Sequence, residues 1–95
     1  MKFEWNTDKA RRNQQKHGVS FSEALSVFKD ALSLTYPDAD HSAEEDRFLI
    51  IGFSSLGNVL VISHTFRNDV VRVISARKAT KKERSFYENE ARHCS

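Results

Sequence analysis

Three apolar segments joined by short turns constrain the fold of this chain more than any other feature. Residues 47–53 (RFLIIGF), 59–66 (VLVISHTF) and 70–76 (VVRVISA) are rich in β-branched and aromatic side chains. The connections between them, at residues 54–58 and 67–69, are too short for a crossover, so the three strands form an antiparallel meander. Their continuous apolar character predicts central positions in a sheet, with a helix layer on one face.

Two capping boxes indicate a helix on each side of this meander. Ser20 is followed three residues later by Glu23, and Thr80 is followed in the same way by Glu83. After the first box, apolar residues recur at the i, i+3, i+4, i+7 positions of a core-facing helix: Phe21, Ala24, Leu25 and Phe28. The second box opens a helix that we expect to run to about Glu90.

A further helix is predicted over residues 8–17 (DKARRNQQKH), which are strong helix formers. Asn6 or Thr7 can cap its start, and Gly18 supplies the left-handed residue that ends it. Ala10 is its only small apolar residue, so this helix buries a narrow stripe and leaves one side for a partner or ligand.

Two shorter strands complete the predicted order. In residues 2–5, polar and aromatic side chains alternate. Residues 30–35 carry leucines at the alternate positions 32 and 34, and Tyr36-Pro37-Asp38 then ends the predicted strand. The acidic stretch 38–46 contains no Lys or Arg and is expected to be an exposed loop. The order β-α-α-β-β-β-β-α predicts one α+β domain: an antiparallel meander sheet with two N-terminal helices packed on it and a C-terminal helix.

Length and composition agree with a single small domain over residues 1–95, with a frayed tail at about 91–95. No apolar run approaches the ~20 residues that cross a bilayer, and the start of the chain carries no secretory signal. Cys94 is the only cysteine, so no internal disulfide is possible and a cytoplasmic location is expected. No spaced Cys or His set suggests a metal, and we expect no cofactor.

Positive charge is concentrated between residues 64 and 87. Seven Lys or Arg side chains and only two acidic ones give this segment +5, within a chain of net charge +2. Arg67 and Arg77 are the leading phosphate ligands, because guanidinium groups bind phosphate bidentately and remain charged. Alternatively, both arginines solvate strand ends or pair with Asp69 or Glu83.

Other side chains have a functional and a structural interpretation. Tyr87 can transfer a proton or stack on a base, but a tyrosine on an amphipathic helix more often packs. His64 and His17 can act in acid–base chemistry, although a lone histidine is usually a polar surface residue. At the end of the first predicted helix, the helix dipole can also stabilise a protonated His17 in a purely structural role. Lys9, Lys78 and Lys81 are among the lysines that can contact phosphates without reading sequence. From the residues alone, the prediction is a small α+β domain with a basic site.

Three segments resemble the BrnT family of bacterial toxins. They are FEWNTDKARRNQQKHGVSFSEALSVFKD at 3–30, EEDRFLIIGFS at 44–54 and HTFRNDVVRVISARKATKKERSFY at 64–87. The resemblance implies a RelE-like fold and a ribonuclease that cleaves RNA and inhibits translation. It also implies neutralisation by a BrnA-like ribbon-helix-helix antitoxin. With that antitoxin, usually as a heterotetramer, such a toxin binds operator DNA and represses its own operon.

The mechanism that the resemblance implies is metal-free. The candidate catalytic residues are Arg67, Arg77, Tyr87, His64 and Glu83. Those expected to hold the RNA backbone are Lys9, Lys78, Lys81, Arg84 and His17. The arginines would clamp the phosphate, Tyr87 or His64 would donate a proton, and the base is open between Glu83, His17 and His64. We also expect Arg67, Arg77 and Tyr87 to converge at one end of the sheet. The alternatives are a non-enzymatic nucleic-acid-binding module and a purely structural partner protein.

Overall fold

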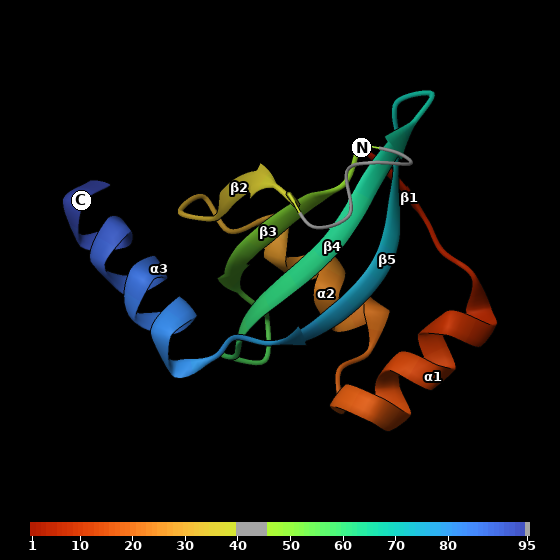
Figure 1. Cartoon of the computed structure of the whole chain (residues 1–95), viewed down its shortest axis with the longest axis horizontal. Coiled ribbons are helices and arrows are strands. Elements are labelled where there is room, and N and C mark those ends of the chain that lie inside the picture. The colour runs from red at the N-terminus through yellow and green to blue at the C-terminus, as the bar shows by residue number, and fades with distance from the viewer. Residues whose placement is uncertain (40–45, 95) are drawn as a thin grey trace.

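The computed structural model describes residues 1–39 and 46–94, with side chains described as far as residue 91. Its elements follow the predicted order (Figure 1). They are β1 (Lys2–Glu4), α1 (Thr7–His17), α2 (Phe21–Val27), β2 (Leu34–Pro37), β3 (Phe48–Phe53), β4 (Val59–Arg67), β5 (Val70–Lys78) and α3 (Lys81–Cys94). Three acidic residues of the predicted exposed loop, Asp40, Glu44 and Glu45, lie outside the described residues.

The five strands form one sheet in the order β1-β5-β4-β3-β2. The predicted meander is confirmed, because β2, β3, β4 and β5 pair antiparallel with their sequence neighbours. The sheet as a whole is mixed, since β1 pairs parallel to β5 with Phe3 opposite Val71. The helices α1 and α2 separate β1 from β2, so no hairpin turn sets the direction of β1.

Both sheet faces are partly covered, by different helices. Residues of α2 and of the α1–α2 connection form the main core with inward-facing residues of β3, β4 and β5: Val19, Phe21, Ala24, Val27, Ile50, Leu60, Ile62, Val73 and Ala76. On the opposite face, Tyr87 of α3 packs on Ile51, Val59 and Val61. Figure 1 shows α2 behind the sheet and α3 projecting at one end. The site described below lies on the face that α3 covers only in part.

The polar helix α1 is attached to the sheet by a buried asparagine. The side chain of Asn13 donates to the carbonyls of Ala76 (2.8 Å) and Val19 (3.0 Å), and it accepts from the Ala76 N–H (3.0 Å). The strand β1 pairs only with residues 70–72 of β5. At Ala76, the Asn13 amide therefore makes the hydrogen bonds that a neighbouring strand would otherwise make. The helix therefore needs only a narrow apolar stripe, as predicted from its composition.

Several predicted boundaries change. The strand expected at 30–35 begins at Leu34 and continues through Tyr36 and Pro37. Proline is tolerated there because β2 is the edge strand and needs no N–H at that position. Residues 30–33 form turns instead, with the Asp30 carboxylate accepting from the N–H of Leu32 (3.0 Å). The last helix extends past Glu90 to Cys94, so the backbone of the expected tail is helical through residue 94.

Candidate functional site

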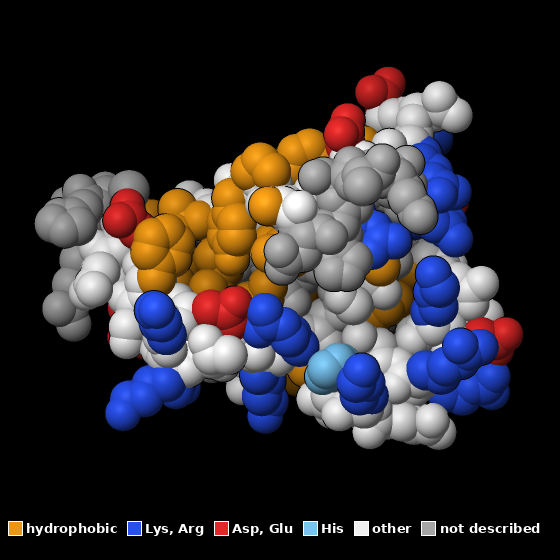
Figure 2. Space-filling model, viewed as in Figure 1, with side chains coloured by type: hydrophobic (Ala, Val, Ile, Leu, Met, Phe, Trp, Pro, Cys, Tyr) orange, Lys and Arg blue, Asp and Glu red, His pale blue; other side chains and the backbone are white. Residues whose placement is uncertain are grey.

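The open part of the sheet carries a cationic rim. Arg77 lies opposite Val61 in the β4–β5 register, so its side chain is on the face that Tyr87 covers and away from α1 and α2. Figure 2 shows this face: Lys and Arg side chains gather along one rim between the start of α3 and α1, and hydrophobic side chains fill the region between α3 and the sheet. This arrangement offers both charge and apolar surface to a ligand.

Arg77 forms a bidentate ion pair with Glu83, at the junction of β5 and α3. Its Nη1 and Nη2 donate to the two carboxylate oxygens at 2.7 and 2.9 Å. Glu83 also accepts from the Thr80 N–H (2.9 Å), and the Thr80 hydroxyl accepts from the Glu83 N–H (3.1 Å), so the predicted capping box is confirmed. The hydrogen bond from Arg77 holds the pKa of Glu83 down to about 2, and this bond to Glu83 raises the pKa of Arg77.

Tyr36 is a member of this cluster that the sequence analysis did not single out. It is half-buried on β2, opposite Leu49 of β3. Burial raises the pKa of its hydroxyl, and the Glu83 charge raises it further, while Arg77 acts in the opposite direction. Tyr36 therefore lies within electrostatic range of the ion pair and stays protonated at neutral pH. Because the segment Tyr36-Pro37-Asp38 was predicted to end the strand, the position of Tyr36 on the sheet was not predicted.

A hollow of about 280 Å³ lies beside Arg77 on the same face. Its polar lining comes from the β2–β3 connection, β4 and β5, and it mixes arginines, hydroxyls and a carboxylate: Asp38, Arg47, Ser63, Ser75 and Arg77. Leu49 and Ile74 complete it. Such a mixture of cations and hydroxyl groups suits a phosphate with its attached sugar.

The expected convergence of Arg67, Arg77 and Tyr87 is wrong. Arg67 pairs with Val70 beside the Asn68–Asp69 turn, while Arg77 pairs with Val61 six residues earlier on β4. At about 3.3 Å per residue, the two arginines lie roughly 20 Å apart along the strand. A hairpin places residues near its turn far from residues near its open end, so Arg67 and Arg77 cannot clamp one phosphate.

His64 lies on the opposite face from Arg77 and is 1% exposed. Aromatic rings surround its imidazole, with centroid distances of 5.0 Å to Phe28, 5.5 Å to Phe66 and 6.1 Å to Phe48. Burial lowers its pKa, partly offset by the contact of Nδ1 with the Ile62 carbonyl at 3.3 Å. His64 is therefore placed as a neutral core residue and not beside the expected arginines.

Tyr87 is also buried, at 3% exposure, and its hydroxyl donates to Oδ2 of Asp30 at 2.5 Å. The same carboxylate oxygen accepts from the Phe53 N–H at 2.8 Å. Burial and the bond to Asp30 raise the pKa of Tyr87 to about 12. This geometry fits an anchor for α3 better than a proton donor to a substrate.

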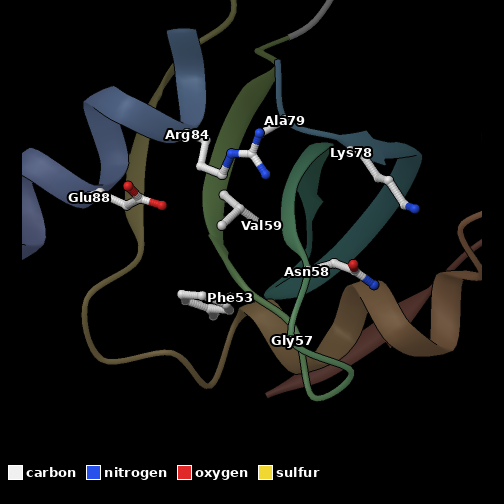
Figure 3. A pocket seen from close by; sticks show the side chains of 8 residues that line it. All are labelled: Phe53, Gly57, Asn58, Val59, Lys78, Ala79, Arg84 and Glu88. Carbon is white, nitrogen blue, oxygen red and sulfur yellow. The ribbon is translucent and has the colours of Figure 1, made fainter. Parts of the chain in front are cut away.

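The expected RNA-binding residues divide between two other hollows. Lys78 and Arg84 line one of about 410 Å³ between α3, the end of β5 and the β3–β4 turn, drawn in Figure 3. Lys9 and His17 line another of about 200 Å³ between α1 and β5, together with Arg12, Lys16 and Ser75. Lys81 is exposed at the start of α3. Ser75 lines both the α1 hollow and the hollow beside Arg77, so these two adjoin across β5.

Within residues 1–39 and 46–94, no helix is long and apolar enough to cross a membrane. In the same part of the chain, no three side chains among His, Cys, Asp and Glu gather in a group that could hold a metal ion.

The structure thus defines the class of protein: an α+β domain with a mixed five-stranded sheet and a cationic rim on one face. The family model for the ribonuclease toxin, BrnT, of type II toxin–antitoxin systems matches residues 5–83. The chain therefore belongs to the BrnT family, which confirms the resemblance found in the sequence. As a toxin of such a system, it has an antitoxin partner.

A solved structure agrees with the family match. The crystal structure of the Brucella abortus ribonuclease toxin, BrnT, has a TM-score of 0.64 to this chain at 24% sequence identity. The similarity covers 85% of this chain and 99% of that one, and at this identity it shows the fold. Among curated proteins, none matches the sequence.

Proposed function

We propose that this toxin is a metal-independent endoribonuclease whose catalytic centre comprises Arg77, Glu83 and Tyr36. The observation that carries the proposal is the Arg77–Glu83 ion pair, with Tyr36 in its field, beside a hollow lined by further hydroxyl and guanidinium groups. Family membership supplies the reaction class, ribonuclease. The arrangement supplies a cation, a carboxylate and a phenol, which can act as charge stabiliser, general base and general acid in phosphodiester transfer.

The proposed reaction begins with attack of a ribose 2′-OH on the adjacent phosphorus. The new O–P bond forms as the bond to the 5′-oxygen of the next nucleotide breaks, giving a 2′,3′-cyclic phosphate and a 5′-OH. Arg77 binds the non-bridging oxygens, where negative charge grows in the transition state. One proton leaves the 2′-OH and one must reach the 5′-oxygen.

Glu83 is the proposed base. Its pKa of about 2 shows that Arg77 strongly stabilises the carboxylate, which by itself makes a weak base. A substrate phosphate that draws the Arg77 guanidinium toward itself weakens this stabilisation and raises the pKa of Glu83 toward its ordinary range. The base is thus activated only when a phosphate is bound.

Tyr36 is the proposed acid. Burial and the Glu83 charge raise its pKa, so the hydroxyl carries its proton at neutral pH and can donate it to the 5′-oxygen. Tyr36 takes the role that the resemblance assigned to Tyr87 or His64, both of which are buried elsewhere. In the proposed complex, Lys9, Lys78, Lys81 and His17 contact the RNA backbone, and Arg84 contacts the RNA beneath α3. Arg67 contacts RNA that extends to the far end of the sheet.

Purified protein incubated with RNA in EDTA tests this proposal. We expect wild-type cleavage to survive the chelator, Arg77→Ala to reduce the rate at least 100-fold, and Tyr36→Phe to reduce it about 10- to 100-fold. Arg11→Ala is the matched control, because Arg11 also pairs with a carboxylate (Asp8, 2.6 Å) but lies exposed on α1. Cleavage that stops in EDTA, or that proceeds equally in Arg77→Ala, contradicts the mechanism.

One observation favours a second candidate, a nucleic-acid-binding module without catalysis. Both terminal nitrogens of Arg77 already donate to Glu83, which leaves less of the guanidinium for a phosphate. This alternative predicts salt-dependent RNA binding with no cleavage products at any protein concentration. Growth arrest on expression that Arg77→Ala relieves, at unchanged folded content, would instead favour the enzyme.

We propose further that the partner is a BrnA-like antitoxin with a ribbon-helix-helix domain. The complex would be a cytoplasmic heterotetramer that binds operator DNA and represses its own operon. Family membership supports the existence of an antitoxin, and the cationic rim gives it a surface to cover. Co-expression with the neighbouring reading frame tests this: the mass of the complex gives its stoichiometry, and a reporter on the shared promoter gives repression.

A further inference from the structure

The hollow beneath α3 is separate from the catalytic cluster and has the chemistry of a base-binding pocket. It measures about 410 Å³ and is lined by Phe53, Val59, Ala79, Arg84 and Glu88, with Gly57, Asn58 and Lys78 at its margin. Figure 3 shows the guanidinium of Arg84 and the carboxylate of Glu88 extending from α3 over the hollow, with the Phe53 ring across from them. An apolar floor with a few convergent polar groups is typical of a small-ligand site.

Phe53 provides a fixed aromatic surface. Its side chain is 45% exposed, yet it is held from two directions. Its ring packs edge-on against Tyr87, with centroids 5.9 Å apart, and its N–H donates to Asp30 at 2.8 Å. An exposed aromatic ring beside basic side chains is the usual platform on which a protein stacks an unpaired RNA base.

Arg84 and Glu88 provide a donor and an acceptor one helical turn apart. They lie on either side of Tyr87 in the sequence, so the buried Tyr87–Asp30 bond fixes the turn that presents them. Although their charges are opposite and their spacing is i, i+4, no ion pair joins them among the described residues. Both groups therefore face the hollow with hydrogen-bonding capacity for a ligand.

Guanine is the base that complements this pair. It presents two adjacent acceptors, O6 and N7, which match a guanidinium, and two adjacent donors, N1–H and N2–H₂, which match a carboxylate. Adenine and uracil each offer the carboxylate fewer donors, and cytosine offers one amino group and a smaller ring to stack. We propose that this hollow binds a guanine of the RNA substrate and sets the sequence preference of the toxin. The inference rests on the proposed function for its ligand, RNA.

Binding of non-cleavable 2′-O-methyl pentauridines with one central substitution tests the pocket. The central base is guanine, inosine (which lacks the N2 amino group), 7-deazaguanine (which lacks N7), adenine, cytosine or uracil. We expect wild type to bind the guanine oligonucleotide roughly tenfold more tightly than the adenine one, with inosine and 7-deazaguanine in between. Equal affinity for all six, or a preference for cytosine, overturns the inference.

Variants assign the contacts. We expect Glu88→Gln to remove the difference between guanine and inosine, and Arg84→Gln to remove that between guanine and 7-deazaguanine. Phe53→Leu should weaken binding of every base and leave the ranking intact. Lys82→Gln and Glu90→Gln are matched controls: each lies two residues, about 200°, around α3 from its counterpart, and each should leave the ranking unchanged.

The same experiment separates this inference from the proposed function. Arg77→Ala should lose cleavage and keep the guanine preference. A wild-type protein that prefers guanine but never cleaves RNA overturns the catalytic proposal alone, and one that cleaves but ranks all bases equally overturns the pocket alone. If Glu88→Gln and Phe53→Leu bind every oligonucleotide as wild type does but lose affinity for the antitoxin, the hollow is an antitoxin contact and the inference is wrong.

Discussion

The hydroxyl of Tyr87 donates to Asp30 Oδ2 at 2.5 Å and so joins the second turn of α3 to the segment that follows α2. Tyr87 also packs on Ile51, Val59 and Val61, with Ala79 beside them, so the bond fixes a residue through which α3 contacts the sheet. The arrangement gives Tyr87 a structural role, whereas the sequence resemblance assigned it a catalytic one. These two roles predict different phenotypes.

We therefore expect Tyr87→Phe to lower the free energy of unfolding by about 1–2 kcal/mol, because the Asp30 carboxylate loses one of its donors. Its cleavage rate should stay within about twofold of wild type at a temperature well below the melting transition. Urea unfolding and a single-turnover RNA assay measure the two quantities. A folded Tyr87→Phe protein of wild-type stability that has lost cleavage would restore the catalytic role.

Gly52 makes room for this bond. A Cβ at position 52 would lie 2.9 Å from Asp30 Oδ2 and 3.1 Å from both Val27 Cγ1 and Ser33 Cβ. We expect Gly52→Ala to cost about 1–3 kcal/mol by overpacking and to displace the Asp30 carboxylate.

Gly57→Ala is the comparison for Gly52→Ala. A Cβ there meets no atom within 4 Å, but the residue has φ +81°, so the cost is about 1 kcal/mol of backbone strain. Urea unfolding gives both costs. The ionisation of the Tyr87 hydroxyl, followed by ultraviolet absorbance during an alkaline titration, should change only in Gly52→Ala. An unchanged titration in Gly52→Ala would show that the carboxylate had not moved.

Most of the secondary structure could be predicted because its signals are local. Helix caps act within four residues, and short turns between apolar strands leave only an antiparallel meander. The bonds of Asn6 to Asp8 and Lys9 and that of Ser20 to Glu23 confirm two such caps. The parallel pairing of β1 was missed because it joins segments that are almost 70 residues apart.

The site was harder to predict, because alternation along a strand does not say which face a helix covers. His64 and Arg77 both lie on apolar strands, yet one is enclosed by aromatic rings and the other is on the open face. Tyr36 could not be assigned to the site from the sequence, because the predicted strand ended at residue 35 whereas β2 continues through Pro37. The separation of Arg67 from Arg77 could have been predicted from the hairpin register. Arg67 flanks the two-residue turn, and Arg77 lies near the open end of the same hairpin.

Asn13 offers a test of how a polar helix is held to a sheet edge. Asn13→Asp keeps an acceptor for the Ala76 N–H but places a carboxylate near the carbonyls of Ala76 and Val19, at sites where the amide nitrogen now donates. We expect it to cost more stability than Asn13→Ala, which itself should cost about 2–3 kcal/mol. Urea unfolding measures both variants, and amide exchange at Ala76 should accelerate in both. Equal stability of the two variants would mean that the amide donors contribute little.

The Arg77–Glu83 pair predicts how stability changes with acid. Folding lowers the pKa of Glu83 from 4.5 to about 2, so the folded state favours the carboxylate. This stabilisation is complete above pH 4.5 and is lost as the pH falls from 4.5 to 2. Because the Arg77 side chain is 38% exposed, solvent screening reduces the contribution to about 1–2 kcal/mol.

Glu83→Gln isolates this contribution. Its free energy of unfolding should lie about 1–2 kcal/mol below that of wild type at pH 7, and the two should converge as the pH approaches 2. Asp8→Asn, which removes the carboxylate of the exposed Arg11–Asp8 pair, should differ from wild type by less than about 0.5 kcal/mol throughout. Urea unfolding at intervals between pH 2 and 7 provides the comparison. A constant gap between wild type and Glu83→Gln would show that the ion pair is not what stabilises the junction of β5 and α3.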